Sequence, residues 1–187
     1  ITRNFDISSN MGSYHYGYDD GAGTHGSNFN SYASASASSG WWNNTGPTST
    51  QFSLGTFFDD NGTFIAYLWH DVPGLQKFGT YEGNASSGNG PFVELGFRPA
   101  MIMIHNIDIN SSAADWVIYD TARNPHNVAD LKLTSNTDDS ENGNSQTGGT
   151  SYNNIDILSN GFKMKTNNGA TNENATRFIF AAFAEHP

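Results

Sequence analysis

The sequence predicts an all-β fold, and three observations support this prediction. Short apolar segments follow one another with turns rich in Gly and Asn between them. No segment shows a sustained helical period. One apolar, aromatic-rich run occurs twice, at residues 64–73 and 178–187, an offset of 114 residues. Each copy is a gapless run that ends at Pro, which is typical of a strand buried on both faces.

The individual strands are expected where apolar runs stand between turn signals. Tyr14, Tyr16 and Tyr18 alternate, which would place all three rings on one face of a strand. Residues 51–58 are expected to form a strand that the turn sequence Asp-Asp-Asn-Gly at 59–62 joins to the first repeated run. Before the second repeated run, strands are expected at residues 75–81, 92–95, 100–105, 116–119, 131–133, 155–158 and 162–165.

The repeat also predicts how the chain is divided. At the same offset of 114 residues, Phe5-Asp6 aligns with Tyr119-Asp120. We therefore expect two β-sandwich-like repeat units, a partial one over residues 1–73 and a complete one over residues 74–187. The first unit has no counterpart of residues 74–114, and missing strands leave open sheet edges. We expect either that the chain is a piece of a longer protein or that another chain supplies the missing strands.

Composition excludes several classes of function. The chain has 8 Lys and Arg against 18 Asp and Glu, a formal net charge of −10. Such a chain repels phosphate backbones and anionic membranes, so neither nucleic acid nor a membrane is an expected partner. No apolar run approaches the ~18 residues of a membrane span. There is no Cys, which rules out disulfides and thiolate metal sites.

Several longer phrases resemble an uncharacterised repeat domain of tail-fibre and other virion appendage proteins of marine phages, including cyanophages. The resemblance is close over residues 74–187 and looser over 41–73, whereas residues 1–40 depart from it. It implies a β-rich, oligomeric module of a virion surface, and it brings no catalytic residues. The phrases are KFGTYEGN at 77–84, GPFVELGFRPA at 90–100, DWVIYDTARNP at 115–125, LSNGFK at 158–163, FAEHP at 183–187, WNNTGPTSTQFSLG at 42–55 and FIAYLW at 64–69.

The sequence does not favour an enzyme. Glycoside hydrolysis needs two carboxylates at a set separation, and we expect Glu94 instead to form a structural ion pair with Arg98. His70-Asp71 and Glu185-His186 are neighbours in sequence, so on a strand they face opposite sides and form no dyad. No Gly-x-Ser-x-Gly sequence marks a nucleophile. The carboxylates considered are Glu82, Glu94, Asp115, Asp120 and Glu185.

Five aromatic residues are the predicted ligand-binding residues, because Tyr and Trp offer flat apolar faces that suit sugar rings and protein surfaces. Trp41 and Trp42 cannot both face inward on a regular strand, so one is expected to be exposed or to lie at a subunit interface. The alternative places one Trp in the core and the tyrosines against a neighbouring chain. The five residues are Tyr14, Tyr16, Tyr18, Trp41 and Trp42.

Two polar loops have simpler interpretations. Asp138, Asp139 and Glu141 carry oxygen ligands of the kind that Ca²⁺ uses, but without EF-hand spacing, so they are weak calcium candidates and no other metal site is expected. In the segment Arg-Asn-Pro-His-Asn at 123–127, Arg and Asn are expected to satisfy backbone groups of the loop.

The leading functional expectation is a non-enzymatic virion structural protein, a tail-fibre or surface-appendage module that adheres to the host surface. It would act outside the cell as a homo-oligomer, with a trimer as the first candidate. Its partners would be other virion proteins and a host surface glycan or protein. The alternatives are a carbohydrate-binding or glycan-degrading module and a self-assembling extracellular filament that accepts strands from the next subunit.

Overall fold

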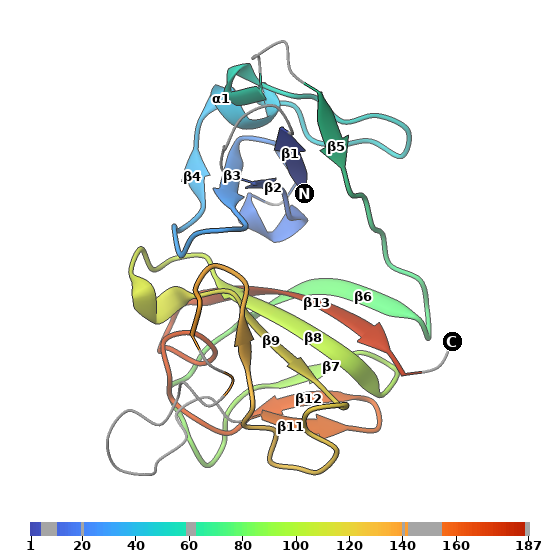
Figure 1. The fold of residues 1–187 in the computed structure, drawn as a ribbon, viewed down its shortest axis with the longest axis vertical. Helices are drawn as coiled ribbons and strands as arrows, with labels where there is room; N and C mark the ends of the chain where they lie inside the picture. Colours follow the sequence, from blue (N-terminus) through green and yellow to red (C-terminus); the bar gives the residue numbers. More distant parts are fainter. Residues whose placement is uncertain (5–10, 20, 59–62, 140, 142–154, 186–187) are drawn as a thin grey trace.

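Regular structure in this chain is almost entirely strand, which confirms the predicted all-β fold (Figure 1). The computed structural model describes residues 1–4, 11–19, 21–58, 63–139, 141 and 155–185. Within these ranges the strands form three antiparallel sheets, accompanied by one short α-helix. None of the described helices is long and apolar enough to cross a membrane.

Two of the sheets pack face to face as a sandwich. A five-stranded sheet has the order β10-β9-β8-β13-β6, and a three-stranded sheet has the order β11-β12-β7. Their strands are β6 (Gln76–Glu82), β7 (Phe92–Glu94), β8 (Pro99–Asn106), β9 (Val117–Asp120), β10 (Leu133–Thr134), β11 (Ile155–Leu158), β12 (Gly161–Met164) and β13 (Arg177–Ala184). The strands expected along residues 74–187 are therefore present, with ends shifted by one or two residues.

Strand β13 lies at the centre of the molecule. It pairs with β6 on one side and with β8 on the other. Phe178, Phe180 and Ala182 point into the core between the two sheets, and the Phe178 ring stacks on Tyr81 with centroids 4.9 Å apart. The alternate residues face the opposite side of the sheet, where Ile179 is buried and Ala181 and Phe183 are half-buried. The second copy of the repeated run is therefore a strand, as expected, but only its core face is fully buried.

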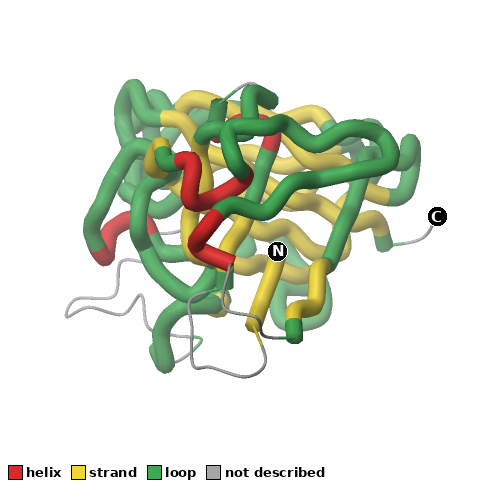
Figure 2. The backbone as a smooth tube through the Cα atoms, turned by 90° about the horizontal axis from the view of Figure 1, so that it is seen from above, coloured by secondary structure: helices red, strands yellow, loops and turns green. Residues whose placement is uncertain are grey.

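The first 66 residues contribute a third sheet, of order β4-β3-β2-β1-β5. It lies above the outer face of the five-stranded sheet (Figures 1 and 2). Among the described residues, no strand of this sheet pairs with a strand of the sandwich. The elements are β1 (Thr2–Asn4), β2 (Gly12–Ser13), η1 (Tyr16–Tyr18), β3 (His25–Asn28), β4 (Ser36–Ala37), α1 (Ser39–Trp42), η2 (Thr56–Phe58) and β5 (Phe64–Ala66), with η3 (Ser112–Ala114) in the sandwich part.

Side chains hold the N-terminal part to the sandwich. Tyr18 packs with Ile107, Trp116 and Ile179 in a second apolar cluster. His105 is fully buried beside it and stacks on the Trp116 ring, with centroids 4.3 Å apart and planes 6° apart. Its Nδ1 lies 3.0 Å from the Ala114 carbonyl oxygen and its Nε2 lies 3.3 Å from that of Ala33. His105 thus links the sheet to the N-terminal segment.

The first copy of the repeated run differs from the prediction. Only Phe64–Ala66 is strand, and the following residues Tyr67, Leu68 and Trp69 are 47%, 69% and 47% exposed. The two copies differ in the number of strands that lie beside them. Strand β13 is hydrogen-bonded along both sides, whereas among the described residues β5 pairs with the three-residue β1 alone. The two copies are alike in sequence, but only one is sandwiched between strands.

The other aligned segments also pair differently in the two parts. Strand β1 pairs directly and antiparallel with β5. The segments aligned with them, β9 and β13, both pair antiparallel with β8, which lies between them. In the first part β1 and β5 are therefore direct neighbours. The predicted match of Phe5-Asp6 with Tyr119-Asp120 and the predicted turn at 59–62 lie outside the described residues.

Three further expectations in the N-terminal part are wrong. The tyrosines do not alternate on a strand, because the 3₁₀ turn η1 begins at Tyr16, with the His15 side chain accepting a hydrogen bond from Gly17 N–H. Residues 51–58 contain no strand and end in η2. Trp41 and Trp42 lie on helix α1, which Ser38 caps. Close aromatic packing explains this region, since the Phe57 ring meets Trp41 edge-on at 5.0 Å.

In the loop after β9 the expectation holds for the two Asn residues, whereas the Arg123 side chain pairs with Asp120 and Glu141. Asn124 accepts hydrogen bonds from the backbone N–H groups of Asp130 and Leu131 and donates to the Leu131 carbonyl oxygen. Asn127 forms both a donated and an accepted hydrogen bond with the backbone of Ile157. These amides satisfy loop and strand backbone groups, which stabilises an irregular segment without regular structure of its own.

The sandwich core gives the first testable prediction. Phe162 is fully buried between the sheets, whereas Phe92 on the adjacent strand is 46% exposed. Replacing Phe162 with Ala should lower the free energy of unfolding by about 3–5 kcal/mol, because apolar contacts are lost and a cavity remains. Phe92→Ala should cost less than about 1 kcal/mol. Urea unfolding of both variants measures this, and equal losses would contradict the assigned core.

The buried imidazole of His105 gives a pH prediction. Burial lowers the pKa of His105 to about 4, against the opposing effect of the Ala33 and Ala114 carbonyl groups. The unfolded chain therefore takes up a proton at higher pH than the folded chain does. The contribution of His105 to the free energy of unfolding should be fully present above about pH 6.5. It should fall by about 1.4 kcal/mol per pH unit as the pH is lowered towards 4.

The same pH prediction has a matched control. Urea unfolding at pH 7 and pH 5 should show a smaller pH dependence in His105→Gln than in the wild type. His15, whose pKa burial also lowers to about 4, adds to the effect in both proteins. His126 is exposed, so His126→Gln should keep the wild-type pH dependence. An unchanged pH dependence in His105→Gln would contradict the prediction.

Candidate functional site

A cleft lies between the N-terminal part and the outer face of the five-stranded sheet. Its volume is about 650 Å³, which is in the range of small-molecule sites. Aromatic rings from both parts of the chain line it, and the segment that leads from β5 to β6 closes one side. We examined this cleft as the candidate functional site.

The floor of the cleft follows from the alternation of β13. Ala181 and Phe183 project from the face opposite to the core, and the strand register places Phe78 and Met103 beside Ala181. Met101 lies beside Phe183 in the same way. All five residues line the cleft. The floor is therefore apolar and includes two Met side chains, which adapt readily to the shape of a ligand.

One wall is the segment of residues 67–71, which we call the strap. The rings of Tyr67 and Trp69 stack with centroids 6.1 Å apart and planes 18° apart. The strap is fixed at its end, because Asp71 Oδ1 accepts a hydrogen bond of 2.8 Å from Phe78 N–H on β6. In addition, Gln76 Nε2 donates to the His70 carbonyl oxygen at 2.6 Å. The exposed aromatic faces are therefore held in place beside the floor.

Tyr14 and His15 form the inner wall and offer few polar atoms to a ligand. The Tyr14 hydroxyl and His15 Nε2 are both covered and have no hydrogen-bond partner. Because His15 Nδ1 accepts a hydrogen bond from Gly17 N–H, the neutral ring carries its proton on Nε2. Burial lowers the pKa of His15 to about 4 and, together with Asp19 and Tyr16, raises that of Tyr14 to about 12. Both side chains are uncharged near neutral pH.

The charge of the cleft is negative. Asp71 is the carboxylate among the lining residues, and no Lys or Arg of the described residues lines the cleft. The amine of Ile1 also lines the cleft, where it donates to the Tyr67 carbonyl oxygen at 3.1 Å and burial lowers its pKa to about 6. The nearby Lys77 directs its ammonium group to the Glu94 carbonyl oxygen on β7, at 2.8 Å. Asp71 also acts on His15, where its charge raises the pKa against the larger effect of burial.

Of the five predicted ligand-binding residues, four line the cleft: Tyr14, Tyr16, Tyr18 and Trp42. Their environments differ. Tyr16 is 66% exposed, whereas Tyr18 is buried and its hydroxyl is hydrogen-bonded to Ser13 Oγ at 2.9 Å. Tyr16 is thus accessible to a ligand, and Tyr18 supports the structure.

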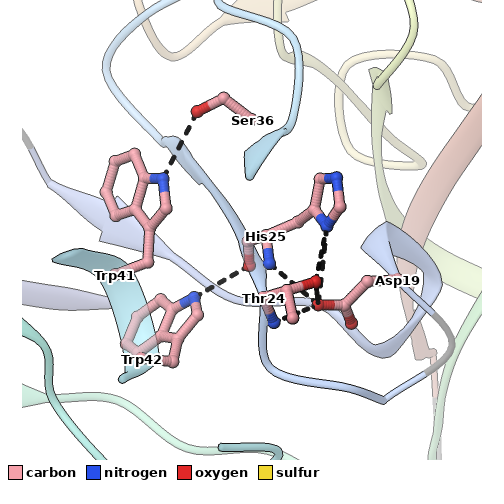
Figure 3. Close-up of polar contacts among 6 residues, drawn as sticks. All are labelled: Asp19, Thr24, His25, Ser36, Trp41 and Trp42. Atoms are coloured by element: carbon pink, nitrogen blue, oxygen red, sulfur yellow. Dashed lines mark hydrogen bonds and ion pairs between the residues drawn. The ribbon is translucent and has the colours of Figure 1, made fainter. Parts of the chain in front are cut away.

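Both tryptophans are buried, which corrects the expectation that one would be exposed or at a subunit interface. A helical turn, unlike a strand, can bury two successive side chains. Trp41 Nε1 donates to Ser36 Oγ at 3.3 Å, and Trp42 Nε1 donates to the His25 carbonyl oxygen at 3.0 Å (Figure 3). Trp41 does not line the cleft. Its role is to pack the N-terminal part.

Asp19, Thr24 and His25 lie together beside these tryptophans, and they resemble a catalytic triad in composition only (Figure 3). Asp19 Oδ2 accepts hydrogen bonds from the N–H groups of Thr24 and His25 and from the Thr24 hydroxyl. Burial alone would raise the pKa of Asp19, but these hydrogen bonds lower it. The carboxylate lies 3.7 Å from His25 Nδ1. The Thr24 hydroxyl, and not the His25 imidazole, lies between the other two side chains, so these three residues stabilise a turn and do not form a triad.

The predicted carboxylates are not gathered into one site. None of Glu82, Glu94, Asp115, Asp120 and Glu185 lines the cleft. The expected Glu94–Arg98 ion pair is wrong, because Arg98 Nε instead lies 3.2 Å from Glu185 Oε2. Asp120 pairs with Arg123 and Asp115 accepts a hydrogen bond from Asn136.

The calcium candidates Asp139 and Glu141 each contact a different partner. Asp139 accepts a hydrogen bond from the Thr137 hydroxyl at 3.0 Å, and Glu141 lies 3.9 Å from Arg123. In the part of the chain that the structure describes, no three His, Asp or Glu side chains converge as metal ligands would. The residues of the cleft likewise offer no cluster for a metal ion.

Sequence reasoning missed the strap and the floor. Tyr67 and Trp69 stood inside a run predicted to be buried, and the floor residues looked like ordinary core. The number of expected strands was a usable signal. The first unit was expected to lack central strands, so the run at 64–73 would have too few neighbouring strands to bury it on both faces. That shortage is what leaves the strap exposed.

Comparison with known proteins places the chain in a family without assigning it an activity. No curated protein and no solved structure matches it. A family model described as a domain of unknown function, DUF7483, matches residues 1–187. The chain therefore belongs to the DUF7483 family.

Proposed function

We propose that this chain is a non-enzymatic adhesion module of a virion appendage, such as a tail fibre, and that the cleft binds a component of the host surface. The observation that carries the proposal is the aromatic strap, whose Tyr67 and Trp69 faces are accessible and fixed beside an apolar floor. Exposed aromatic rings held rigidly are a common way to bind with little loss of conformational entropy.

The surrounding fold supports this role. The sandwich provides a firm base, because β13 is hydrogen-bonded on both sides and its core face is fully buried. The strap and η1, which carry the accessible rings, are irregular segments placed on that base. Binding residues on loops above a rigid sheet are a frequent arrangement. The resemblance to virion appendage proteins adds the setting, with a homo-oligomer, a trimer first, as the assembled form.

A carbohydrate-binding module is the second candidate, because the exposed Tyr16 ring and the strap offer flat faces for a sugar. Glycan cleavage has less support, since the carboxylates considered for it lie away from the cleft. The two activities can be separated by incubating the chain with surface polysaccharide and assaying reducing ends. The adhesion proposal expects retention of polysaccharide without release of sugar.

The proposal predicts that filling the cleft abolishes adhesion. Ala181 is at the centre of the floor, so Ala181→Phe places a ring in the cleft and leaves the core face of β13 unchanged. Binding to an array of bacterial surface polysaccharides should fall at least about tenfold, as expected when a contact of 1.4 kcal/mol or more is lost.

The control for this experiment is Ala122→Phe, which adds the same ring at an exposed position after β9. It should bind the array as the wild type does. Circular dichroism confirms that both variants fold. If Ala181→Phe folds and binds the array as well as Ala122→Phe, the cleft is not the adhesive site and the proposal fails.

A further inference from the structure

We infer that the group recognised in the cleft is an alkylated ammonium: a cation with an apolar surface, such as a trimethylammonium group. The inference rests on the proposed function of the cleft as a binding site and names the chemistry of its ligand. Three features of the cleft, namely its charge, its ring faces and its shortage of polar atoms, lead to it.

Charge excludes one class of ligand. The cleft contains the Asp71 carboxylate and no Lys or Arg among the described residues, and the nearest Lys on β6 is turned to the other side of the sheet. The chain as a whole carries a formal charge of −10. The Ile1 amine, whose pKa burial lowers to about 6, is largely uncharged at pH 8, so an anionic ligand, such as a carboxylate or a sulfate, would meet repulsion from both Asp71 and the chain as a whole.

The shortage of polar atoms weakens the case for a sugar. A sugar ring needs several hydrogen-bond partners in addition to a flat aromatic face, because its hydroxyl groups lose water on binding. Here the Tyr14 hydroxyl and His15 Nε2 are covered, and the Ser13 and Tyr18 hydroxyls are hydrogen-bonded to each other. The lining also includes the polar side chains of His70 and Thr80, but most of what a ligand meets in the cleft is ring faces and apolar side chains, with the carboxylate of Asp71 beside them.

Ring faces and a carboxylate together suit an alkylated ammonium. The face of Trp or Tyr attracts a cation, and Trp does so most strongly. Trp69, Tyr67 and Tyr16 offer such faces at the accessible side of the cleft. Methyl groups on the nitrogen fit the apolar floor of Phe78, Met101 and Phe183. A trimethylammonium group needs no hydrogen bond, so the lack of polar partners costs it nothing.

The test compares choline with its neutral carbon isostere, in which a tert-butyl group replaces the trimethylammonium group. Titration calorimetry at pH 8, above the pKa of about 6 to which burial lowers the Ile1 amine, should show choline binding about tenfold more tightly than the isostere. Equal binding would overturn the inference and still leave the cleft as a ligand site. Tighter binding of a methyl hexoside than of choline would overturn it in favour of a sugar.

Two pairs of variants test the residues. Asp71→Asn keeps the hydrogen bond from Phe78 N–H but removes the charge, so it should reduce the preference for choline by about tenfold. Glu94→Gln, which removes an exposed charge on β7, should leave the preference unchanged. Trp69→Ala should weaken choline binding about tenfold, whereas Phe92→Ala, which removes an exposed ring outside the cleft, should change it less than about twofold. If Asp71→Asn behaves as Glu94→Gln does, the inference fails.

A third probe identifies where the ammonium comes from. Binding of phosphocholine as tightly as choline supports the ammonium class with a phosphate-linked source, such as a decorated surface polymer or a lipid headgroup. Tighter binding of choline than of phosphocholine supports an alkylated ammonium ligand that has no adjacent phosphate. If choline and its isostere both fail to bind the wild type, the inference is overturned. The polysaccharide array with Ala181→Phe then still decides the proposed function independently.

Discussion

The apolar character of both faces of β13 is the constraint on which the rest of the structure depends. One face supplies Phe178 and Phe180 to the sandwich core, and the other carries Ile179, Ala181 and Phe183. An apolar outer face cannot be left to water without a large loss of stability. The N-terminal part covers the end of this face near Ile179, where Tyr18 and Trp116 pack on it. The other end, near Ala181 and Phe183, becomes the floor of the cleft.

The strap results from the same constraint acting on a similar sequence. The run at 64–69 has the apolar character of the run at 178–183, but the strands beside it are too few and too short to bury it. The chain therefore leaves the sheet after Ala66 and descends to β6, carrying its aromatic residues in the open. The repeat yields one structural strand and one accessible aromatic segment.

The sequence predicted the sandwich well and the N-terminal part poorly, for a physical reason. In residues 74–187 strands are bounded by clear turn signals, and apolar alternation agrees with the pairing that forms. In residues 11–58, most elements have two to four residues and depend on aromatic packing and side-chain caps such as His15 and Ser38. The aromatic contacts join residues that are distant in sequence, such as Trp41 and Phe57, and the caps span only two residues, so the apolar pattern reveals neither.

The candidate site was predictable in kind but not in position. The prediction that aromatic faces carry binding identified Tyr14, Tyr16, Tyr18 and Trp42, and all four line the cleft. It could not separate accessible rings from structural ones, because exposure is a property of the packed chain. Trp42 is buried under the N-terminal sheet, whereas Trp69, expected in a core strand, is open to solvent.

The acidic character of the chain takes on a specific meaning at the cleft. Spread over a surface, excess carboxylates maintain solubility and disfavour anionic partners. Asp71, however, is an exposed carboxylate that Phe78 N–H fixes beside aromatic rings and apolar side chains, which places its charge next to faces that attract a cation. A negative charge in such a place favours cations that shed water easily, and alkylated ammonium ions shed it more easily than Lys side chains do. The site would therefore discriminate among cations by hydration as well as by charge.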